Sequence, residues 1–225
     1  MNFEDILSEL KASADPEAVE GMSQFGINAE NTLGISIPEL RKLAKKIGKD
    51  HISAQKLWET EIHEARILAS MVDKPKLLTG AQMEDWVKDF DSWDVCDQVC
   101  NNLFRKTPYA YQKAVEWSGR QEEFVKRAGF VLMATTAVHD KKTNDKKFIE
   151  FLEIIKDKSD DQRNYVKKAI NWALRQIGKR NRILNKEAIK TAEEIKSLKY
   201  KSARWIASDA LRELKSDKVR ERLGI

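Results

Sequence analysis

A short helical pattern recurs along this chain at intervals that are typical of stacked helical repeats. Residues 124–128 (Phe-Val-Lys-Arg-Ala) are echoed 41 residues later by residues 165–169 (Tyr-Val-Lys-Lys-Ala), and related copies surround Ala65 and Ala203. The small residue of each copy recurs after 63, 41 and 34 residues. The first interval holds two units of about 32 residues, with the middle copy near Asp97. These periods match the helical pairs of HEAT or armadillo arrays, in which each pair packs on the next.

The rest of the chain predicts helix after helix and no strand. Apolar residues recur at helical spacing, and prolines or capping Asp, Ser and Thr residues stand near the expected helix starts. Nine glycines and four prolines leave little room for long loops or a linker. We therefore expect an all-α curved solenoid of HEAT-like repeats, forming a single domain over 1–225, rather than a plain helical bundle. The expected helices cover 2–12, 16–26, 37–48, 54–74, 81–90, 92–105, 108–119, 122–138, 145–157, 162–180, 185–198, 201–214 and 217–223.

One predicted helix carries a tryptophan on a basic face. Between Gln162 and Lys186 the chain has eight cations and no acid. An indole among cations is suited to binding a nucleic acid, although a tryptophan half-buried under lysine stems is the alternative. At 100° per residue the segment divides into two faces. The apolar face holds Val166, Ala169, Ile170, Ala173 and Ile177, and the opposite face holds Lys168, Trp172, Arg175 and Lys179.

The charge distribution and the cysteines narrow the class of protein. Residues 1–120 carry 15 Lys+Arg against 20 Asp+Glu, whereas residues 121–225 carry 26 against 16. This asymmetry indicates a nucleic acid or an anionic surface as the partner of the C-terminal half. No apolar run reaches the ~18 residues of a membrane span, and the acidic N-terminus does not resemble a signal peptide, so we expect a cytoplasmic protein. Cys96 and Cys100 fit neither a zinc nor a redox motif; we expect buried, reduced thiols and no metal or cofactor.

Four residues form a candidate constellation on successive repeats. Trp93 and Asp97 are four residues apart and therefore share one face of their helix. Arg127 is nearly alone in an apolar helix one repeat later, where an arginine either reaches out of the packing or neutralises a neighbouring acid. Trp172 follows after one further repeat. Stacked side by side, these helices would bring two indoles, one carboxylate and one guanidinium to a concave surface.

In these stretches the chain resembles the AlkD family of HEAT-like repeat DNA glycosylases, which release alkylated purines from DNA. The resemblance covers nearly the whole length and is carried by residues 34–42, 92–97, 124–128 and 165–175. It implies that Asp97 is the catalytic carboxylate, that Trp93 and Trp172 line the sugar and the lesion, and that Arg127 contacts phosphate. The family often has a second tryptophan where this chain has Ser92. It also has a tyrosine near the lesion where this chain has Phe25, so we expect Phe25 to lie close to the lesion without a hydroxyl.

The expected activity is hydrolysis of the N-glycosidic bond of cationic purines, of the 3-methyladenine or 7-methylguanine type, in double-stranded DNA. We expect a monomer whose Lys168, Arg175, Lys179 and Arg182 bind the DNA backbone. The resemblance also implies that the damaged base is not swung into a deep pocket. Two alternatives remain: a non-catalytic protein that binds damaged or branched DNA, and a scaffold for protein interactions.

Overall fold

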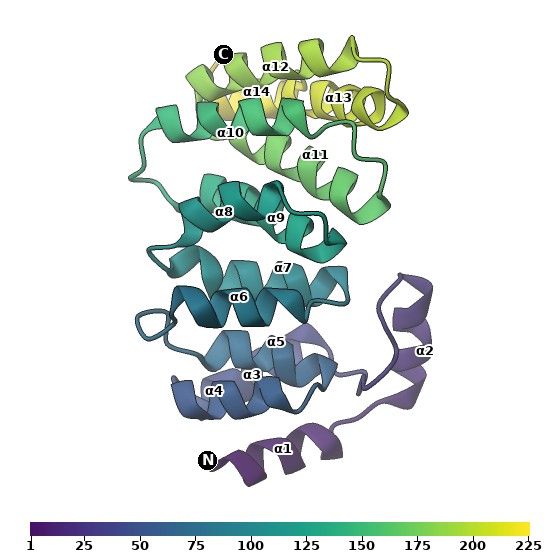
Figure 1. The fold of residues 1–225 in the computed structure, drawn as a ribbon, viewed down its shortest axis with the longest axis vertical. Coiled ribbons are helices and arrows are strands. Elements are labelled where there is room, and N and C mark those ends of the chain that lie inside the picture. Colours follow the sequence, from purple (N-terminus) through teal and green to yellow (C-terminus); the bar gives the residue numbers. More distant parts are fainter. The chain divides into compact units, whose positions relative to one another are not determined.

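A computed structural model describes residues 1–225 as helices joined by short loops (Figure 1). The chain forms fourteen α-helices and one 3₁₀ helix and no strand, so the all-α prediction is confirmed. The α-helices are α1 (Phe3–Ala12), α2 (Pro16–Gln24), α3 (Ile37–Ile47), α4 (His51–Glu59), α5 (His63–Val72), α6 (Gly80–Lys88), α7 (Trp93–Asn102), α8 (Ala110–Ser118), α9 (Glu123–His139), α10 (Asp145–Asp157), α11 (Asn164–Gly178), α12 (Arg182–Lys196), α13 (Lys201–Leu214) and α14 (Asp217–Leu223). The 3₁₀ helix η1 is Phe104–Lys106.

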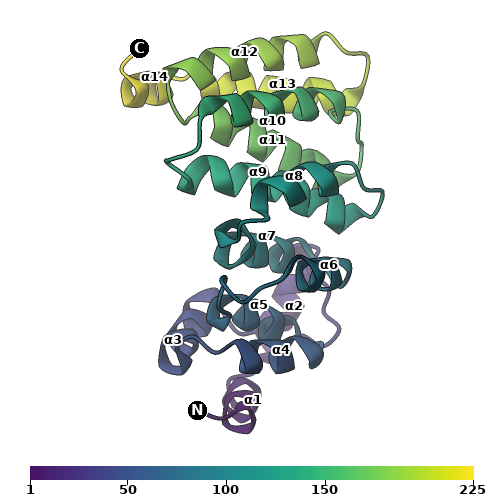
Figure 2. The ribbon, with the colours of Figure 1, turned by 60° about the vertical axis from the view of Figure 1, so that its left-hand side comes forward.

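The helices form two compact units, Met1–Pro108 with α1 to α7 and Tyr109–Ile225 with α8 to α14. In the first unit α4 packs on α5, and α5 also contacts α3 and α7. In the second unit α8 packs on α9 and α12 on α13, while α11 contacts both α9 and α13 (Figure 2). Each unit is therefore built from helical pairs whose second helices pack side by side. The prediction that 1–225 acts as one domain stays a prediction.

The residues that mark the sequence repeat lie on these second helices. Ala65, Ala128, Ala169 and Ala203 lie on α5, α9, α11 and α13, and all four are buried. A small side chain at this place allows neighbouring helices to approach closely. Gly129, next to one of these alanines, shows how close the approach is, because a Cβ there would come within 2.5 Å of the backbone nitrogen of Ser118. The period in the sequence thus corresponds to one helical pair.

The predicted single helix over 54–74 is wrong. The structure has α4 and α5 there, separated by a turn at 60–62. Glu61 has a φ of +59°, and Thr60 supports the turn by donating its hydroxyl to the carbonyl of Leu57 at 2.8 Å. The turn contains no glycine or proline, which are the residues that usually mark a turn in a sequence. A positive φ in another type of residue is uncommon, so the break between α4 and α5 was not predicted. Elsewhere the predicted helix ends differ from the structure by a few residues.

The buried side chains behave as the sequence predicts. Cys96 and Cys100 form no disulfide and have no exposed surface, which confirms the expectation of buried thiols. The first unit also buries two stacked indoles, Trp58 and Trp86, whose ring centroids are 4.0 Å apart.

None of the fourteen helices combines the length and the apolar character that a membrane crossing requires.

Candidate nucleic-acid interface

The first group of predicted site residues lies on α7 and on the turn after α2. Trp93 and Asp97, on successive turns of α7, are both partly exposed, while Val95 and Val99 are buried on its other side. The indole N–H of Trp93 donates to the backbone carbonyl of Phe25 at 3.1 Å. The ring of Phe25 is itself 74% exposed. The hydrogen bond therefore fixes the end of α2 to the face of α7 that carries the carboxylate.

An imidazole on α5 holds the first turn of α7. Nε2 of His63 lies 2.8 Å from a carboxylate oxygen of Asp94, and the other oxygen of Asp94 accepts from the hydroxyl of Ser92 at 2.6 Å. Burial lowers the pKa of His63, but the hydrogen bond to Asp94 and the charges of Asp94, Glu64 and Asp91 together outweigh burial, and the pKa is raised. Burial likewise raises the pKa of Asp94, but the bonds from His63 and Ser92 leave that pKa below its ordinary value. Both pKa shifts favour the charged forms of His63 and Asp94, and Asp94 directly follows Trp93 in the chain.

A buried carboxylate fixes the loop that carries α2. Glu64 has no exposed surface, and its two oxygens accept the backbone N–H groups of Leu33, Gly34 and Ile35 at 2.7–3.2 Å. Gly34 has a φ of +82°, and a Cβ there would lie 2.1 Å from the carbonyl oxygen of Asp15. The N–H of Asp15 donates to the carbonyl of Leu33 at 2.7 Å, which joins the two ends of the α2 segment. In Figure 1, α2 stands apart from α3 to α7, and it buries none of its own residues. Its position therefore depends on this loop.

The second group of predicted site residues begins with Arg127 on α9. Its side chain is buried, with 6% exposed, and Nη1 donates to the backbone carbonyl of Tyr165 on α11 at 2.6 Å. Of the two roles considered for this arginine, reaching out of the packing is therefore wrong. Next to it, Lys126 forms an ion pair with Asp161 at 2.9 Å. Burial raises the pKa of Asp161, but bonds from Arg163 and Lys126 outweigh it and bring the pKa to about 2. These contacts tie α9 to the start of α11.

Trp172 lies outside the core, as its helical position predicts. The five residues predicted for the apolar face of α11 are buried, whereas Trp172 is partly exposed and Lys168 is exposed. With the side-chain oxygen of Gln176 facing the indole, that oxygen accepts from Nε1 of Trp172 at 3.0 Å and from Nζ of Lys179 at 3.3 Å. The indole is thus held by its edge, and part of its surface remains open to solvent.

Two of the predicted DNA-binding cations are already paired with acids. Glu213 on α13 accepts from Nη1 of Arg175 and from Nζ of Lys179, both at 2.5 Å, and Asp209 lies 3.7 Å from Nε of Arg175. Burial raises the pKa of Glu213, but the bonds from Lys179 and Arg175 outweigh it and the pKa is lowered. The positive charge of α11, which has no acids of its own, is therefore partly neutralised by the acids of α13. By contrast, Lys168 has no acidic partner.

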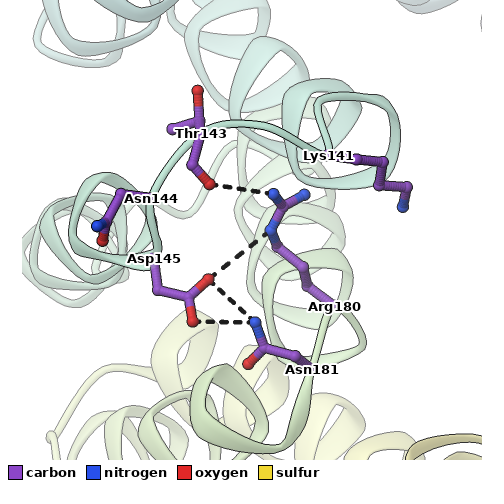
Figure 3. A pocket seen from close by; sticks show the side chains of 6 residues that line it. All are labelled: Lys141, Thr143, Asn144, Asp145, Arg180 and Asn181. Atoms are coloured by element: carbon purple, nitrogen blue, oxygen red, sulfur yellow. Dashed lines mark hydrogen bonds and ion pairs between the residues drawn. The ribbon is translucent and has the colours of Figure 1, made fainter.

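Arg182 and Arg180 hold the end of the second unit together. Nε of Arg182 donates to the carbonyl of Leu223 at 2.7 Å, although the side chain is largely exposed. Arg180 borders a cavity of about 430 Å³ (Figure 3). Its guanidinium donates to the carbonyls of Ala137, Asp140 and Thr143 and lies 3.9 Å from Asp145. Because its donors are used within the fold, Arg180 is a structural cation.

The predicted site residues thus fall into two groups. Phe25, Trp93 and Asp97 belong to the first unit, and Trp93 contacts the Phe25 backbone. The second unit holds Arg127, Lys168, Trp172, Arg175, Lys179 and Arg182. The prediction that residues of both groups line one surface stays a prediction. Sequence reasoning missed the residues that position or neutralise these groups, namely His63, Glu64 and Glu213.

Comparison with known proteins decides the family. The model of the family described as DNA alkylation repair enzyme matches residues 6–214. The chain belongs to this family. A comparison of the chain with curated proteins found no match. A solved structure matches with a TM-score of 0.82 and 21% identity, covering 100% of this chain and 97% of the other. It is described as a new family of proteins related to the HEAT-like repeat DNA glycosylases with affinity for branched DNA structures. This likeness confirms the predicted fold of HEAT-like repeats.

Proposed function

We propose that this protein is a DNA glycosylase that releases cationic N3- or N7-alkylated purines from duplex DNA. The observation that supports this most strongly is the exposed face of α7, where Asp97 and Trp93 lie one turn apart. The residues below this face, His63 and Asp94, are paired with each other, so α7 has a fixed first turn. Catalysis by a charged group depends on such fixed placement.

The chemistry follows from the charge of the substrate. An alkylated purine already carries a positive charge, so it leaves with the electrons of the C1′–N bond as a neutral base and needs no general acid. Positive charge then develops on the deoxyribose, where a carboxylate is stabilising and an indole face adds negative π density. Asp97 serves as this carboxylate, and it accepts a proton from the water that attacks C1′. A single carboxylate therefore suffices, unlike the usual pair in glycoside hydrolysis.

The second unit binds the DNA in this proposal. Lys168 is exposed and unpaired, so it contacts phosphate directly, while Trp172 presents an indole surface beside it on α11. Arg127 lies where α9 contacts α11, through its bond to the Tyr165 carbonyl, and we place a phosphate group of the DNA next to this contact. We further propose that both units act on DNA as one domain, because the family match runs continuously across their boundary at Pro108.

A second candidate function is binding of branched DNA without base release. One observation favours it: the structurally similar protein is described as having affinity for branched DNA structures. Both candidates require DNA binding, and only the glycosylase requires the charge of Asp97.

The test is single-turnover release of 7-methylguanine from alkylated duplex DNA by the wild type and by Asp97→Asn at equal DNA occupancy. Asp97→Asn preserves size and helix position but removes the charge. Loss of one well-placed electrostatic group costs on the order of 10²–10³ in rate. Glu59→Gln, which changes an exposed acid on α4 of the same unit, is the control for a lost carboxylate and should leave the rate of release unchanged. Equal rates for wild type and Asp97→Asn would remove Asp97 from the mechanism. Absence of release from both, with DNA binding retained, would favour the branched-DNA binder.

A further inference from the structure

The start of α13 carries a second group of cations and aromatic rings, separate from the predicted site. From Ile195 to Ser208 the chain has four cations and no acid. The same stretch contains two exposed rings, Tyr200 at 37% and Trp205 at 42%. Exposed aromatic rings set among cations without acids are suited to binding a nucleic acid. The four cations are Lys196, Lys199, Lys201 and Arg204.

The two rings are each accompanied by an ammonium group. Nζ of Lys167, on the neighbouring α11, lies 5.2 Å from the ring centroid of Trp205. Nζ of Lys199 lies 5.6 Å from the ring centroid of Tyr200. Lys201 is four residues before Trp205 on α13, so the two side chains share one face of the helix. We call Lys167, Lys199, Tyr200, Lys201, Arg204 and Trp205 the α13 patch.

The positive charge of the α13 patch is largely uncompensated. Glu194, before it in sequence, pairs with Lys156, and Asp209, after it, pairs with Arg212 and Arg175. Ser202 donates to the carbonyl of Ser159, which brings the exposed Asp160 near the α13 patch as the one acid there without a cation partner. The four cations of the α13 patch therefore face one unpaired acid.

This combination fits an unpaired nucleotide better than a base pair. Bases inside a duplex are covered by their neighbours, whereas an unpaired base offers its flat face to an indole. Cations around the ring then contact the phosphates of the same strand, and Lys168 on α11 continues the positive charge toward Trp172. A protein partner would need an apolar surface around the ring, and the neighbours of Trp205 on the exposed face are charged.

We propose that the α13 patch binds a single-stranded segment of DNA, with Trp205 stacked on an unpaired base and Lys199, Lys201 and Arg204 on its phosphates. The proposal rests on the proposed binding of DNA, but it does not depend on base release. It gives the protein a preference for duplexes that carry a flap, a fork or an overhang.

The test compares the affinity for a blunt duplex with that for the same duplex carrying a short single-stranded overhang, measured by fluorescence anisotropy. The wild type is expected to bind the overhang DNA about tenfold more tightly, because stacking on one aromatic ring supports a preference of this order. Trp205→Ala should abolish the preference and Trp205→Phe should retain most of it. Ile149→Ala, an exposed apolar residue on α10, is the control and should leave the preference unchanged. Thermal melting checks that each variant is folded.

Several outcomes would overturn the proposal. These are a wild type without preference for the overhang, a Trp205→Ala protein with the wild-type ratio, and a wild type that binds neither DNA. An exposed indole among cations also suits an anionic membrane surface, so vesicles containing phosphatidylserine form a separate arm. Loss of vesicle binding in Trp205→Ala with no change in the DNA ratio would assign the patch to membranes. Base release from blunt alkylated duplex is measured in parallel, and its absence with an intact overhang preference would reject the glycosylase alone.

A photochemical measurement locates the contact directly. Overhangs that contain 5-iodouracil should cross-link to the peptide that includes Trp205 in the full-length protein. Trp205→Ala should lose that cross-link, while cross-links elsewhere persist. Cross-linking confined to peptides outside α11 and α13 would contradict the proposal.

Discussion

The indole nitrogen of Trp93 donates a hydrogen bond to the backbone carbonyl of Phe25, across 68 positions in the sequence. The bond joins α7, which is well packed, to α2, which buries none of its residues. The partly exposed indole thereby holds the backbone of Phe25, a residue that is itself 74% exposed. A tryptophan expected to touch the sugar of a damaged nucleotide thus also has a structural role.

Trp93→Phe should release the α2 segment without unfolding the protein. The phenyl ring keeps an aromatic surface but has no N–H, and a hydrogen bond of this kind contributes about 0.5–1.5 kcal/mol. Hydrogen exchange of the amides in 16–27 should become faster, while that of α4 and α5 stays unchanged. Trp205→Phe is the matched control, because the indole nitrogen of Trp205 has no such partner. Equal exchange in both variants would show that the bond to Phe25 does not hold α2.

Glu213→Gln should strengthen DNA binding. The substitution removes the charge that pairs with Arg175 and Lys179, and each cation that then reaches a phosphate steepens the salt dependence of log K by about 0.9. Lys168→Ala should reduce the magnitude of this salt slope by about 1, because the exposed lysine is not paired with an acid and contacts phosphate directly. Lys190→Ala, an exposed lysine on α12, serves as the control. A salt slope that is the same for Glu213→Gln and wild type would mean that Arg175 and Lys179 are structural cations only.

The His63–Asp94 pair should give the protein a stability that depends on pH. The charges acting on His63 are Asp94, Glu64 and Asp91, and they raise its pKa in the fold above the ordinary 6.5. A raised pKa contributes stability that is complete below 6.5 and is lost as the pH rises through the folded value. Asp94, whose pKa is lowered from 3.8, loses its contribution as the pH falls through its folded value. The pair is therefore most stabilising between about 4 and 6.5.

Urea denaturation across pH 4–9 checks this expectation. The free energy of unfolding of the wild type should fall as the pH rises past 6.5, and the difference between wild type and His63→Asn should shrink over the same interval. A difference that stays constant with pH would show that the pair does not titrate as described.

Glu64→Gln should destabilise the loop at 33–35 by about 1–3 kcal/mol. The carboxylate accepts three backbone N–H groups with both oxygens, and an amide would set its NH₂ group against at least one of them. Glu59→Gln, an exposed acid on α4, is the control and should be close to neutral. The measurement is the free energy of unfolding in urea. A loss no larger than that of the control would mean that water or a shifted loop replaces the carboxylate.

The fold was predictable because its signals are local. Helical periodicity, capping residues and the alanines of the repeat all act over a few residues, and the helices on which Ala65, Ala128, Ala169 and Ala203 lie follow from them. The break at Glu61 was not predictable, since its positive φ is stabilised by surrounding contacts and not by its own type. The predicted buried and exposed faces of α11 were correct because they also follow from helical periodicity.

The surroundings of the candidate site were not predictable, because they depend on contacts between distant positions. Glu213 neutralises cations that lie 34 and 38 residues earlier in the sequence. The charges along α11 alone therefore do not indicate this pairing. Glu64 and His63 contact residues 29–31 positions away. Their one local signal is the placement of three ionisable residues, His63, Glu64 and Arg66, at the start of a helix that continues as mostly apolar, where a buried charge needs a partner.

The backbone bond between Asp15 and Leu33 has a consequence for how the protein can vary. The chain leaves and returns at nearly the same point, so we expect changes within residues 16–32 to leave the spacing of α1 and α3 unaltered. Phe25 belongs to this segment, whereas Asp97 does not. In the proposed glycosylase, a graft of the corresponding segment from a relative should therefore change the preferred lesion while leaving the melting temperature unchanged. A graft that shifted both together would show that the two properties are not separable.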